Sequence, residues 1–187
     1  MKKFVVIFLI ALALPDINAA QAQTLIEQPY IVLADSSDNN AKTLKGIIDK
    51  NDLANDTSFK WYAESQRIYP RPDTSAVNAF RNNKDKISFI IFGGTWCEDT
   101  HFVLPKFYKI QEASDFPENR ITVFAVDRTK KTRGNIAQAM NIINVPTIIV
   151  MKNGKESGRV VEYGKTGHWD KELADIINSR LSPEGRK

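Results

Sequence analysis

The stretch ISFIIFGGTWCEDTHFVLP, residues 87–105, decides the fold. It opens with a nearly continuous apolar run over residues 87–92, which predicts a strand buried on both faces. Two glycines end that run, and the residues from about Cys97 to 112 are spaced as a helix that Pro105 interrupts. The only cysteine of the chain therefore stands where a buried strand gives way to the first turn of a helix.

That position favours a reactive thiol. The first backbone N–H groups of a helix have no intrahelical partner, and the positive end of the helix dipole stabilises an anion such as a thiolate. Cysteines at helix starts accordingly have lowered pKa values, whereas neighbouring carboxylates such as Glu98 and Asp99 act in the opposite direction. The sequence leaves the balance of these effects open, and we expect an exposed, reactive Cys97 rather than an inert buried one.

The remaining elements follow from periodicity and turn signals. The expected order is β-α-β-α-β-α-β-β-α, an α/β fold with parallel, covered strands early and an antiparallel hairpin late. The hairpin turns at Asn153-Gly154, which is a type I′ signal. We expect strands at 59–63, 87–92, 121–126, 147–151 and 159–163, and helices at 73–83, 97–112, 135–140 and 169–181, with a further short helix at 41–50.

A set of spaced motifs resembles the thioredoxin family. The chain has Trp96-Cys97-Glu98-Asp99-Thr100, then Pro105 eight residues after the cysteine, and Val145-Pro146-Thr147 before the late hairpin. The family has Trp-Cys-x-x-Cys at a helix start, a proline at the same spacing and a cis-proline turn about fifty residues later. The resemblance covers about residues 59–181 and implies a thioredoxin-like fold, a central mixed β-sheet flanked by helices.

The resemblance also implies roles for individual residues. Cys97 would be the nucleophile, and Pro146 would lie in van der Waals contact with it as a cis-proline. The backbone of Val145 would bind an extended substrate strand by edge pairing, and Trp96 would border the groove. The implied partners are protein thiols or disulfides and an external reductant thiol.

The chain departs from the family pattern at two positions. Thr100 stands where the resolving cysteine belongs, so a mixed disulfide at Cys97 must be released by the substrate's own thiol or by an external one. The Thr100 hydroxyl can still donate a hydrogen bond to the Cys97 thiolate, which makes it a candidate site residue beside an ordinary helix position. Ile91 occupies the place of a buried acid that serves the second thiol, which fits the absence of that thiol.

The first residues read as an export signal. Lys2 and Lys3 precede an apolar run over residues 4–14, too short to span a bilayer, and Ala20-Gln21-Ala22 has the form of a signal peptidase site. We expect a signal peptide over 1–22, an N-terminal extension with a short helix over 23–58 and a thioredoxin-like domain over 59–187. The protein would be exported, periplasmic or extracellular, without stable membrane insertion after cleavage; an uncleaved anchor is the alternative.

Composition excludes several kinds of site. One cysteine and two histidines leave no ligand set for a structural zinc or an iron–sulfur cluster, so we expect neither metal nor cofactor. A net charge of +4 without a basic stripe gives no reason to expect nucleic acid binding. His101 is expected on the surface, Trp61 in the core and Asp127 as a turn cap, and the cluster Arg128, Lys130, Lys131 and Arg133 as a solvated loop.

Three functions stay open on the sequence. The first is an exported monothiol protein that performs thiol–disulfide exchange or disulfide isomerisation on protein substrates through Cys97. The second is a redox-inactive binding or chaperone module that uses the same groove. The third, a glutathione-dependent monothiol enzyme of glutaredoxin type, fits less well because Trp96 and the N-terminal extension are more typical of thioredoxins.

Overall fold

A six-stranded mixed sheet forms the centre of the molecule. The computed structural model describes residues 28–35, 37, 41–69 and 71–179. The strands are β1 (Tyr30–Ala34), β2 (Lys42–Ile48), β3 (Ile87–Gly93), β4 (Ile121–Ala125), β5 (Thr147–Lys152) and β6 (Lys155–Val161). They lie in the order β1-β2-β4-β3-β5-β6. Only β3 and β4 pair in parallel, and every other neighbouring pair is antiparallel.

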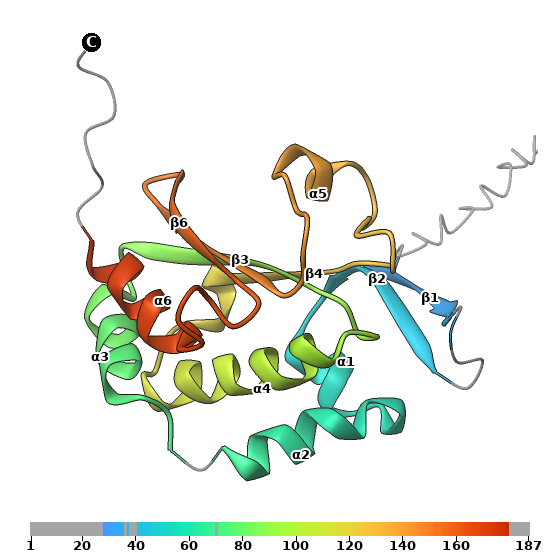
Figure 1. The fold of residues 1–187 in the computed structure, drawn as a ribbon, viewed down its shortest axis with the longest axis horizontal. Coiled ribbons are helices and arrows are strands. Elements are labelled where there is room, and N and C mark those ends of the chain that lie inside the picture. The colour runs from blue at the N-terminus through green and yellow to red at the C-terminus, as the bar shows by residue number, and fades with distance from the viewer. Residues whose placement is uncertain (1–27, 36, 38–40, 70, 180–187) are drawn as a thin grey trace, which may run out of the picture.

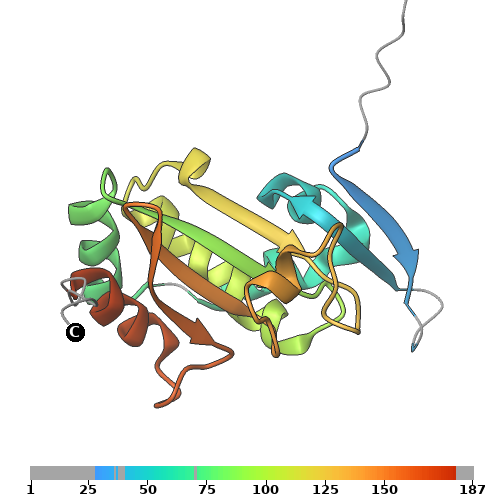
Figure 2. The same ribbon diagram turned by 90° about the horizontal axis from the view of Figure 1, so that it is seen from above.

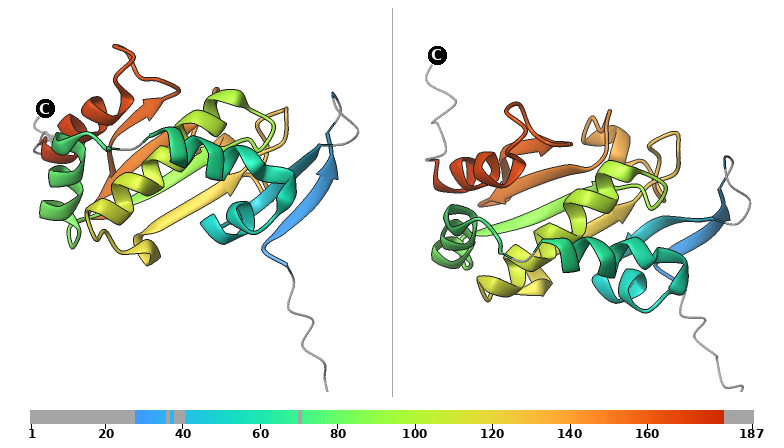
Figure 3. Two further views of the ribbon diagram at one scale, coloured as in Figure 1. Left: turned by 90° about the horizontal axis from the view of Figure 1, so that it is seen from below. Right: turned by 60° about the horizontal axis from the view of Figure 1, so that its bottom comes forward.

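The helices lie mainly on one face of this sheet. They are α1 (Lys50–Ala54), α2 (Lys60–Ile68), α3 (Thr74–Asn83), α4 (Glu98–Ala113), α5 (Ile136–Ala139) and α6 (Trp169–Asn178), with 3-10 turns at Thr57–Phe59 and Glu118–Arg120. In Figure 1, α2 and α4 lie below the sheet and α5 lies above it. Figure 3 shows α4 running across the lower face with α2 beside it. Figure 2 shows that α5 and its flanking loops cover only part of the upper face.

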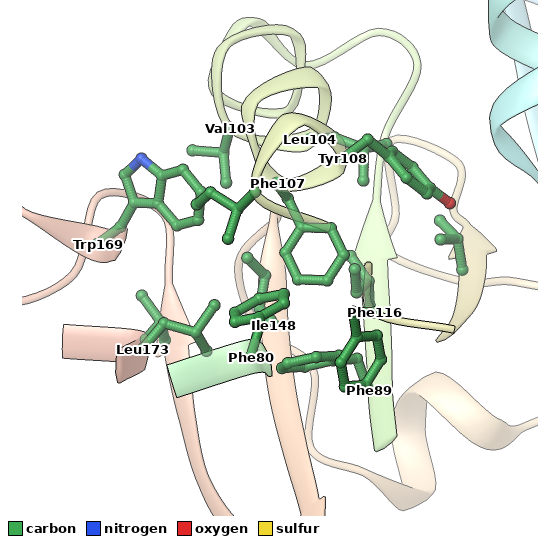
Figure 4. Close-up of a cluster of buried hydrophobic side chains, with 14 of the residues drawn as sticks. Phe80, Phe89, Val103, Leu104, Phe107, Tyr108, Phe116, Ile148, Trp169 and Leu173 are labelled. Carbon is green, nitrogen blue, oxygen red and sulfur yellow. The ribbon is translucent and has the colours of Figure 1, made fainter. Parts of the chain in front are cut away.

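The larger hydrophobic core fills the space between the sheet and the lower helices. Phe80 of α3, Phe89 of β3 and Phe107 of α4 are fully buried and contact one another with ring centroids 4.7 to 5.5 Å apart. Trp169 and Leu173 of α6 close one side of this cluster (Figure 4). This packing fixes α4, and therefore Cys97 at its start, against the strand that precedes it.

The central part of the sequence prediction is confirmed. β3, α4, β4, α5, β5 and α6 lie where they were expected, and Asp73 caps α3 through the N–H groups of Ser75 and Ala76. Asn153 and Gly154 both have positive φ, 52° and 75°, as a type I′ turn requires. β6 runs over Lys155–Val161 and begins directly after that turn, four residues earlier than expected.

Two expected elements are wrong. Residues 41–50 were expected as a short helix, but β2 occupies Lys42–Ile48. Leu44 and Ile48 are buried on one face, a spacing of four that fits a strand as well as a helix. Residues 59–63 were expected as the first strand, but α2 begins at Lys60, because Phe59 and Tyr62 are buried at helical spacing.

The N-terminal part of the described chain belongs to the sheet. β2 pairs with β4, and its Leu44 and Ile48 enter the larger core. The predicted order of the first elements is therefore wrong. The strand beside β4, on the side away from β3, is β2, which pairs antiparallel with both β1 and β4, and not a parallel strand at residues 59–63. The expected signal peptide over 1–22 lies outside the described residues, as do residues 180–187. Within the described part, no helix combines the length and the apolar character needed to cross a membrane.

Candidate functional site

Cys97 lies at the start of α4. It is the N-cap residue, with an extended backbone (φ −101°, ψ 122°), and its carbonyl accepts the first helical hydrogen bond from His101 N–H at 3.0 Å. Its own N–H donates to Gly94 O at 2.9 Å, so the loop after β3 turns tightly into the helix. Cys97 is partly exposed. The helix start therefore presents a single accessible thiol.

The sulfur faces the turn that precedes β5. Cys97 Sγ donates to the carbonyl oxygen of Val145 at 3.2 Å, across 48 residues of sequence. The Val145–Pro146 peptide bond is cis, and both residues are buried. Thr147 Oγ1 donates to Asn144 O at 2.7 Å and closes the turn. The fold thus places the Cys97 sulfur against Val145, whose neighbour Pro146 the family resemblance also pointed to.

The Thr100 side chain binds the loop after β3. Its side chain is 1% exposed, and its Oγ1 accepts a hydrogen bond from Gly94 N–H at 3.2 Å. Between these two described residues, Thr100 and Cys97, the structure contains no side-chain hydrogen bond. The structure gives Thr100 a role that neither alternative named, since its hydroxyl holds the loop after β3 through Gly94.

Trp96 forms one side of the site. Its Nε1 donates to Val126 O at 2.9 Å, which fixes the indole against the end of β4. Two cations lie over the ring, Arg128 with its Cζ 5.0 Å from the ring centroid and Lys130 with its Nζ at 5.7 Å. These are cation–π distances. Part of the expected basic cluster therefore contacts the site, which the expectation of a plain solvated loop missed.

His101 is partly buried, and its expected place on the open surface is wrong. Its ring stacks on Trp61 of α2 with centroids 4.1 Å apart, and its Nε2 lies 2.7 Å from Thr95 O. Burial lowers the pKa of His101, although the contact with Thr95 O and the charge of Glu98 act in the opposite direction. The contacts of His101 with Thr95 O and Trp61 join the loop before Cys97 to α2, and its lowered pKa favours the uncharged ring.

Thr95 joins the same loop to β2. Its Oγ1 accepts from Leu44 N–H at 3.0 Å and donates to Lys42 O at 3.2 Å. The Thr95 hydroxyl thus bonds the Leu44 N–H and the Lys42 carbonyl of β2, as a neighbouring strand would. Because Thr95 immediately precedes Trp96 and Cys97, the loop is held by the N-terminal hairpin as well as by β3 and α4.

Tyr163 and Asp99 lie on another side of Cys97. Burial and the Asp99 carboxylate raise the pKa of Tyr163 to about 12, and Cys97 and Glu98 are among the groups that act on it. The Tyr163 ring packs edge-on against Phe102, with centroids 5.3 Å apart. Glu162 N–H donates to Pro146 O at 2.7 Å, which places the start of this segment beside the proline turn. The sequence offered no signal for Tyr163, since it follows a strand without any motif.

The comparisons with known proteins agree with this geometry. A family model described as Thioredoxin matches residues 74–178, more than half of the chain. Thioredoxin-1 from Saccharomyces cerevisiae is 31% identical over 78 residues, which cover 42% of this chain and 70% of the yeast protein. The chain belongs to the thioredoxin family.

Solved structures with similarity to this thioredoxin-family chain have low TM-scores. Thioredoxin O2 from Arabidopsis thaliana, solved in the oxidized state, has a TM-score of 0.38 and 19% identity, covering 58% of this chain and 85% of that one. A protein of unknown function from Pseudomonas aeruginosa has a TM-score of 0.46 and 15% identity, covering 63% and 81%. The family assignment therefore rests on the family model and the yeast relative.

The site has the thiol of a thioredoxin and lacks the groups that serve a second thiol. Ile91, in the place of the family's buried acid, is 0% exposed and belongs to the larger core. Asp127 is a turn cap as expected, accepting from Thr129 N–H and Lys131 N–H, and it also pairs with Lys45 at 2.6 Å. Among the described residues, no group of histidine, cysteine and carboxylate side chains could hold a metal ion. The family's general chemistry, thiol–disulfide exchange, would fall to Cys97.

Proposed function

We propose that this thioredoxin-family protein is exported and performs thiol–disulfide exchange on extended segments of other proteins through Cys97 alone. The observation that carries the proposal is the place of the sulfur. It lies partly exposed at the N-cap of α4 and 3.2 Å from the carbonyl oxygen of Val145. A nucleophile and a backbone edge for an incoming strand therefore lie side by side.

The surroundings of the thiol suit an apolar polypeptide segment. Ile143 is 75% exposed, two residues before Val145, and Phe102 and Tyr163 are partly exposed at 39% and 37%. Among the described residues, Val145 N–H has no backbone hydrogen-bond partner. An extended segment could pair with this residue and place its disulfide beside Cys97, with its side chains on the apolar groups.

The exchange proceeds in two displacements. The Cys97 thiolate attacks one sulfur of the partner's disulfide, so that a mixed disulfide forms and the partner's other sulfur leaves as a thiolate that takes a proton. A second thiolate, from the partner itself or from an external thiol, then attacks the mixed disulfide and releases Cys97. Attack by a different thiol of the partner gives isomerisation. An external thiol instead leaves its own sulfur on the partner, and a second external thiol then attacks that bond, so that the partner ends with two thiols and the two external thiols end as a disulfide.

The competing function is a binding or chaperone module without redox turnover. The observation in its favour is that Thr100 and Ile91 replace both groups that complete a dithiol cycle, and both are fully buried. The two functions differ in whether a covalent adduct forms. Under the redox function, partners are captured as mixed disulfides; under the binding function, they are captured without a covalent bond.

The test is adduct trapping in the native compartment. The wild type and a Cys97→Ser variant are isolated after acid quenching and alkylation, then compared on non-reducing gels. We expect reducible adducts with the wild type and none with Cys97→Ser. Partners that associate equally with both proteins, without any reducible adduct, would overturn the redox function and support the binding module.

A Thr100→Cys variant probes the geometry of the site. Position 100 lies in the first turn of α4, one turn beyond Cys97, so a second thiol there completes the dithiol motif. We expect this variant to gain disulfide reductase activity toward insulin with a dithiol reductant. A folded variant without any gain would count against the inferred arrangement of Cys97.

Export is proposed from the sequence alone, since residues 1–22 lie outside the described part. Expression of the whole chain in a Gram-negative host, followed by fractionation and mass determination, tests it. We expect a mature protein that begins at Gln23 in the periplasmic fraction. A full-length chain in the membrane fraction would instead indicate an uncleaved anchor.

A further inference from the structure

Asp35, at the end of the N-terminal hairpin, is a buried carboxylate with a dedicated cation. Its side chain is 1% exposed, and its Oδ1 lies 2.9 Å from both Nε and an Nη of Arg128. Ser37 N–H donates to Oδ1 at 2.8 Å and Thr43 Oγ1 donates to Oδ2 at 3.1 Å. The N–H of Ser37, with Arg128 and Thr43, holds the pKa of Asp35 below its usual range, although burial acts in the opposite direction. Asp35 is therefore an ionised anchor.

The Arg128 side chain that Asp35 binds also contacts the loop that carries Cys97. The Arg128 guanidinium that Asp35 holds lies over the indole of Trp96, 5.0 Å from the ring centroid. Trp96 directly precedes Cys97 and borders the groove in which a partner segment would lie. The guanidinium is planar and rigid, so its N–H groups can bind a buried carboxylate while the same group lies over an aromatic ring.

A second contact ties the same hairpin to the same loop. Thr95 Oγ1 bridges the Leu44 N–H and the Lys42 carbonyl of β2, one residue before Trp96. Of the other charges nearby, Lys45 pairs with Asp127, and Lys130 lies over the same indole with its Nζ 5.7 Å from the ring centroid. The hairpin of β1 and β2 therefore contacts the loop before Cys97 directly at the Thr95 side chain, and reaches Trp96 through Arg128.

We propose that Asp35 is a positioning residue, which holds Arg128 against Trp96 and so keeps this wall of the Cys97 groove in place for a partner polypeptide. The proposal rests on the proposed function. Asp35 does not touch the reacting sulfur. Its effect is accordingly on the binding of an extended segment beside Cys97 and not on the thiol itself.

The test compares two disulfide probes on the whole chain. One is dipyridyl disulfide, which is small, and the other is an extended apolar peptide whose cysteine carries a pyridyl disulfide. In both reactions the Cys97 thiolate forms a new S–S bond, the probe's S–S bond breaks, and pyridine-2-thiol leaves with a proton and is followed by absorbance. The ratio of the two rate constants measures how well the groove binds the peptide, because the reaction at sulfur is the same for both probes.

Three variants and a control decide the role of Asp35. Asp35→Asn and Arg128→Gln are each expected to lower the peptide-to-small-probe ratio about three- to tenfold, the range of a partly desolvated cation–π contact. The double variant is expected to lose no more than either single one, since both act through one contact. Lys42→Ala removes an exposed ion pair of the same hairpin, with Asp56, and is expected to leave the ratio within about twofold of wild type.

A structural readout separates this proposal from the proposed function. With 5-fluorotryptophan incorporated, the Trp96 ¹⁹F resonance is assigned by its loss in Trp96→Phe. We expect it to move in Asp35→Asn and Arg128→Gln and to stay in place in Lys42→Ala. An unmoved resonance, or an unchanged rate ratio with a moved one, would overturn the role of Asp35. Arg128 is 39% exposed, so Arg128→Gln decides the question should Asp35→Asn not fold.

If the wild type itself reacts no faster with the peptide than with the small probe, the proposed recognition of extended segments fails. The ¹⁹F shift then still reports whether Asp35 holds Trp96. The two failures therefore have different signatures.

Discussion

Replacing Thr100 with valine is expected to lower stability while leaving the reactivity of Cys97 unchanged. The side chain is 1% exposed, and its hydroxyl is the acceptor for the N–H of buried Gly94 at 3.2 Å. Valine has nearly the same shape but no acceptor, so it leaves that N–H unpaired inside the protein. An unpaired buried group costs about 1–3 kcal/mol. A loss of about 2 kcal/mol corresponds to a fall of about 4–8 °C in the melting temperature for a domain of this size.

The matched control is Thr100→Ser, which keeps the hydroxyl and removes one methyl group. That methyl carbon lies 3.0 Å from where a Cβ on Gly93 would stand, so the site is tightly packed. Loss of one buried methyl costs about 1 kcal/mol. Urea unfolding followed by tryptophan fluorescence measures both variants, and the rate with dipyridyl disulfide measures the thiol.

Two results would refute the reasoning. A Thr100→Val protein as stable as wild type would mean that Gly94 N–H does not depend on Thr100. A large fall in the disulfide rate for Thr100→Val but not for Thr100→Ser would instead show that the hydroxyl orients the thiolate, the role that the geometry disfavours.

Three further outcomes test other parts of the structure. Burial lowers the pKa of His101 below 6.5, so the unfolded state binds the proton more readily than the folded state. We therefore expect the free energy of unfolding to decrease as the pH falls below 6.5, and His101→Asn to remove this part of the pH dependence. Unfolding at several pH values measures it. Burial alone would raise the pKa of Asp127, but Lys45, Thr129 and two backbone N–H groups lower it to about 2. Its contribution is therefore fully present above about pH 4 and falls as the pH is lowered through about 2. Asp127→Asn should cost about 1 kcal/mol at pH 7 and clearly less at pH 2, and an equal cost at both would contradict the ion pair. Gly46→Ala places a Cβ 2.3 Å from Pro29 O at a φ of +137°. We expect the free energy of unfolding in denaturant to fall by roughly 3 kcal/mol or more. An unchanged unfolding midpoint would contradict this packing of the hairpin.

The sequence was sufficient where the signal is local. The apolar run before Gly93 and the helical spacing after Cys97 predicted β3 and α4, and positive φ at Asn153-Gly154 follows from the residue types in that turn. Each of these features depends on residues a few positions apart, which the period of side-chain exposure reveals directly. The thiol at the helix start was visible for the same reason, whereas its link to the distant Pro146 came from the resemblance to the thioredoxin family.

Tertiary structure decided what local periodicity leaves ambiguous. Leu44 and Ile48 fit a strand and a helix alike, and only pairing with β1 and β4 in the sheet made this segment β2. Likewise, the hydrogen bond from Gly94 N–H to the Thr100 hydroxyl joins the buried loop after β3 to α4, and the residue types alone did not indicate it.

The order of residues alone determined a strand, a loop with one thiol and a helix start, because these follow from local backbone preferences; the turn that faces the thiol was expected only from the family resemblance. The contact of Asp35 with Arg128 spans 93 residues and that of Leu44 with Thr95 spans 51. Such contacts form only when a distant hairpin joins the sheet, since burial and hydrogen bonding across that distance depend on the whole fold. Only the tertiary structure therefore decided how the N-terminal hairpin holds the residues around the thiol.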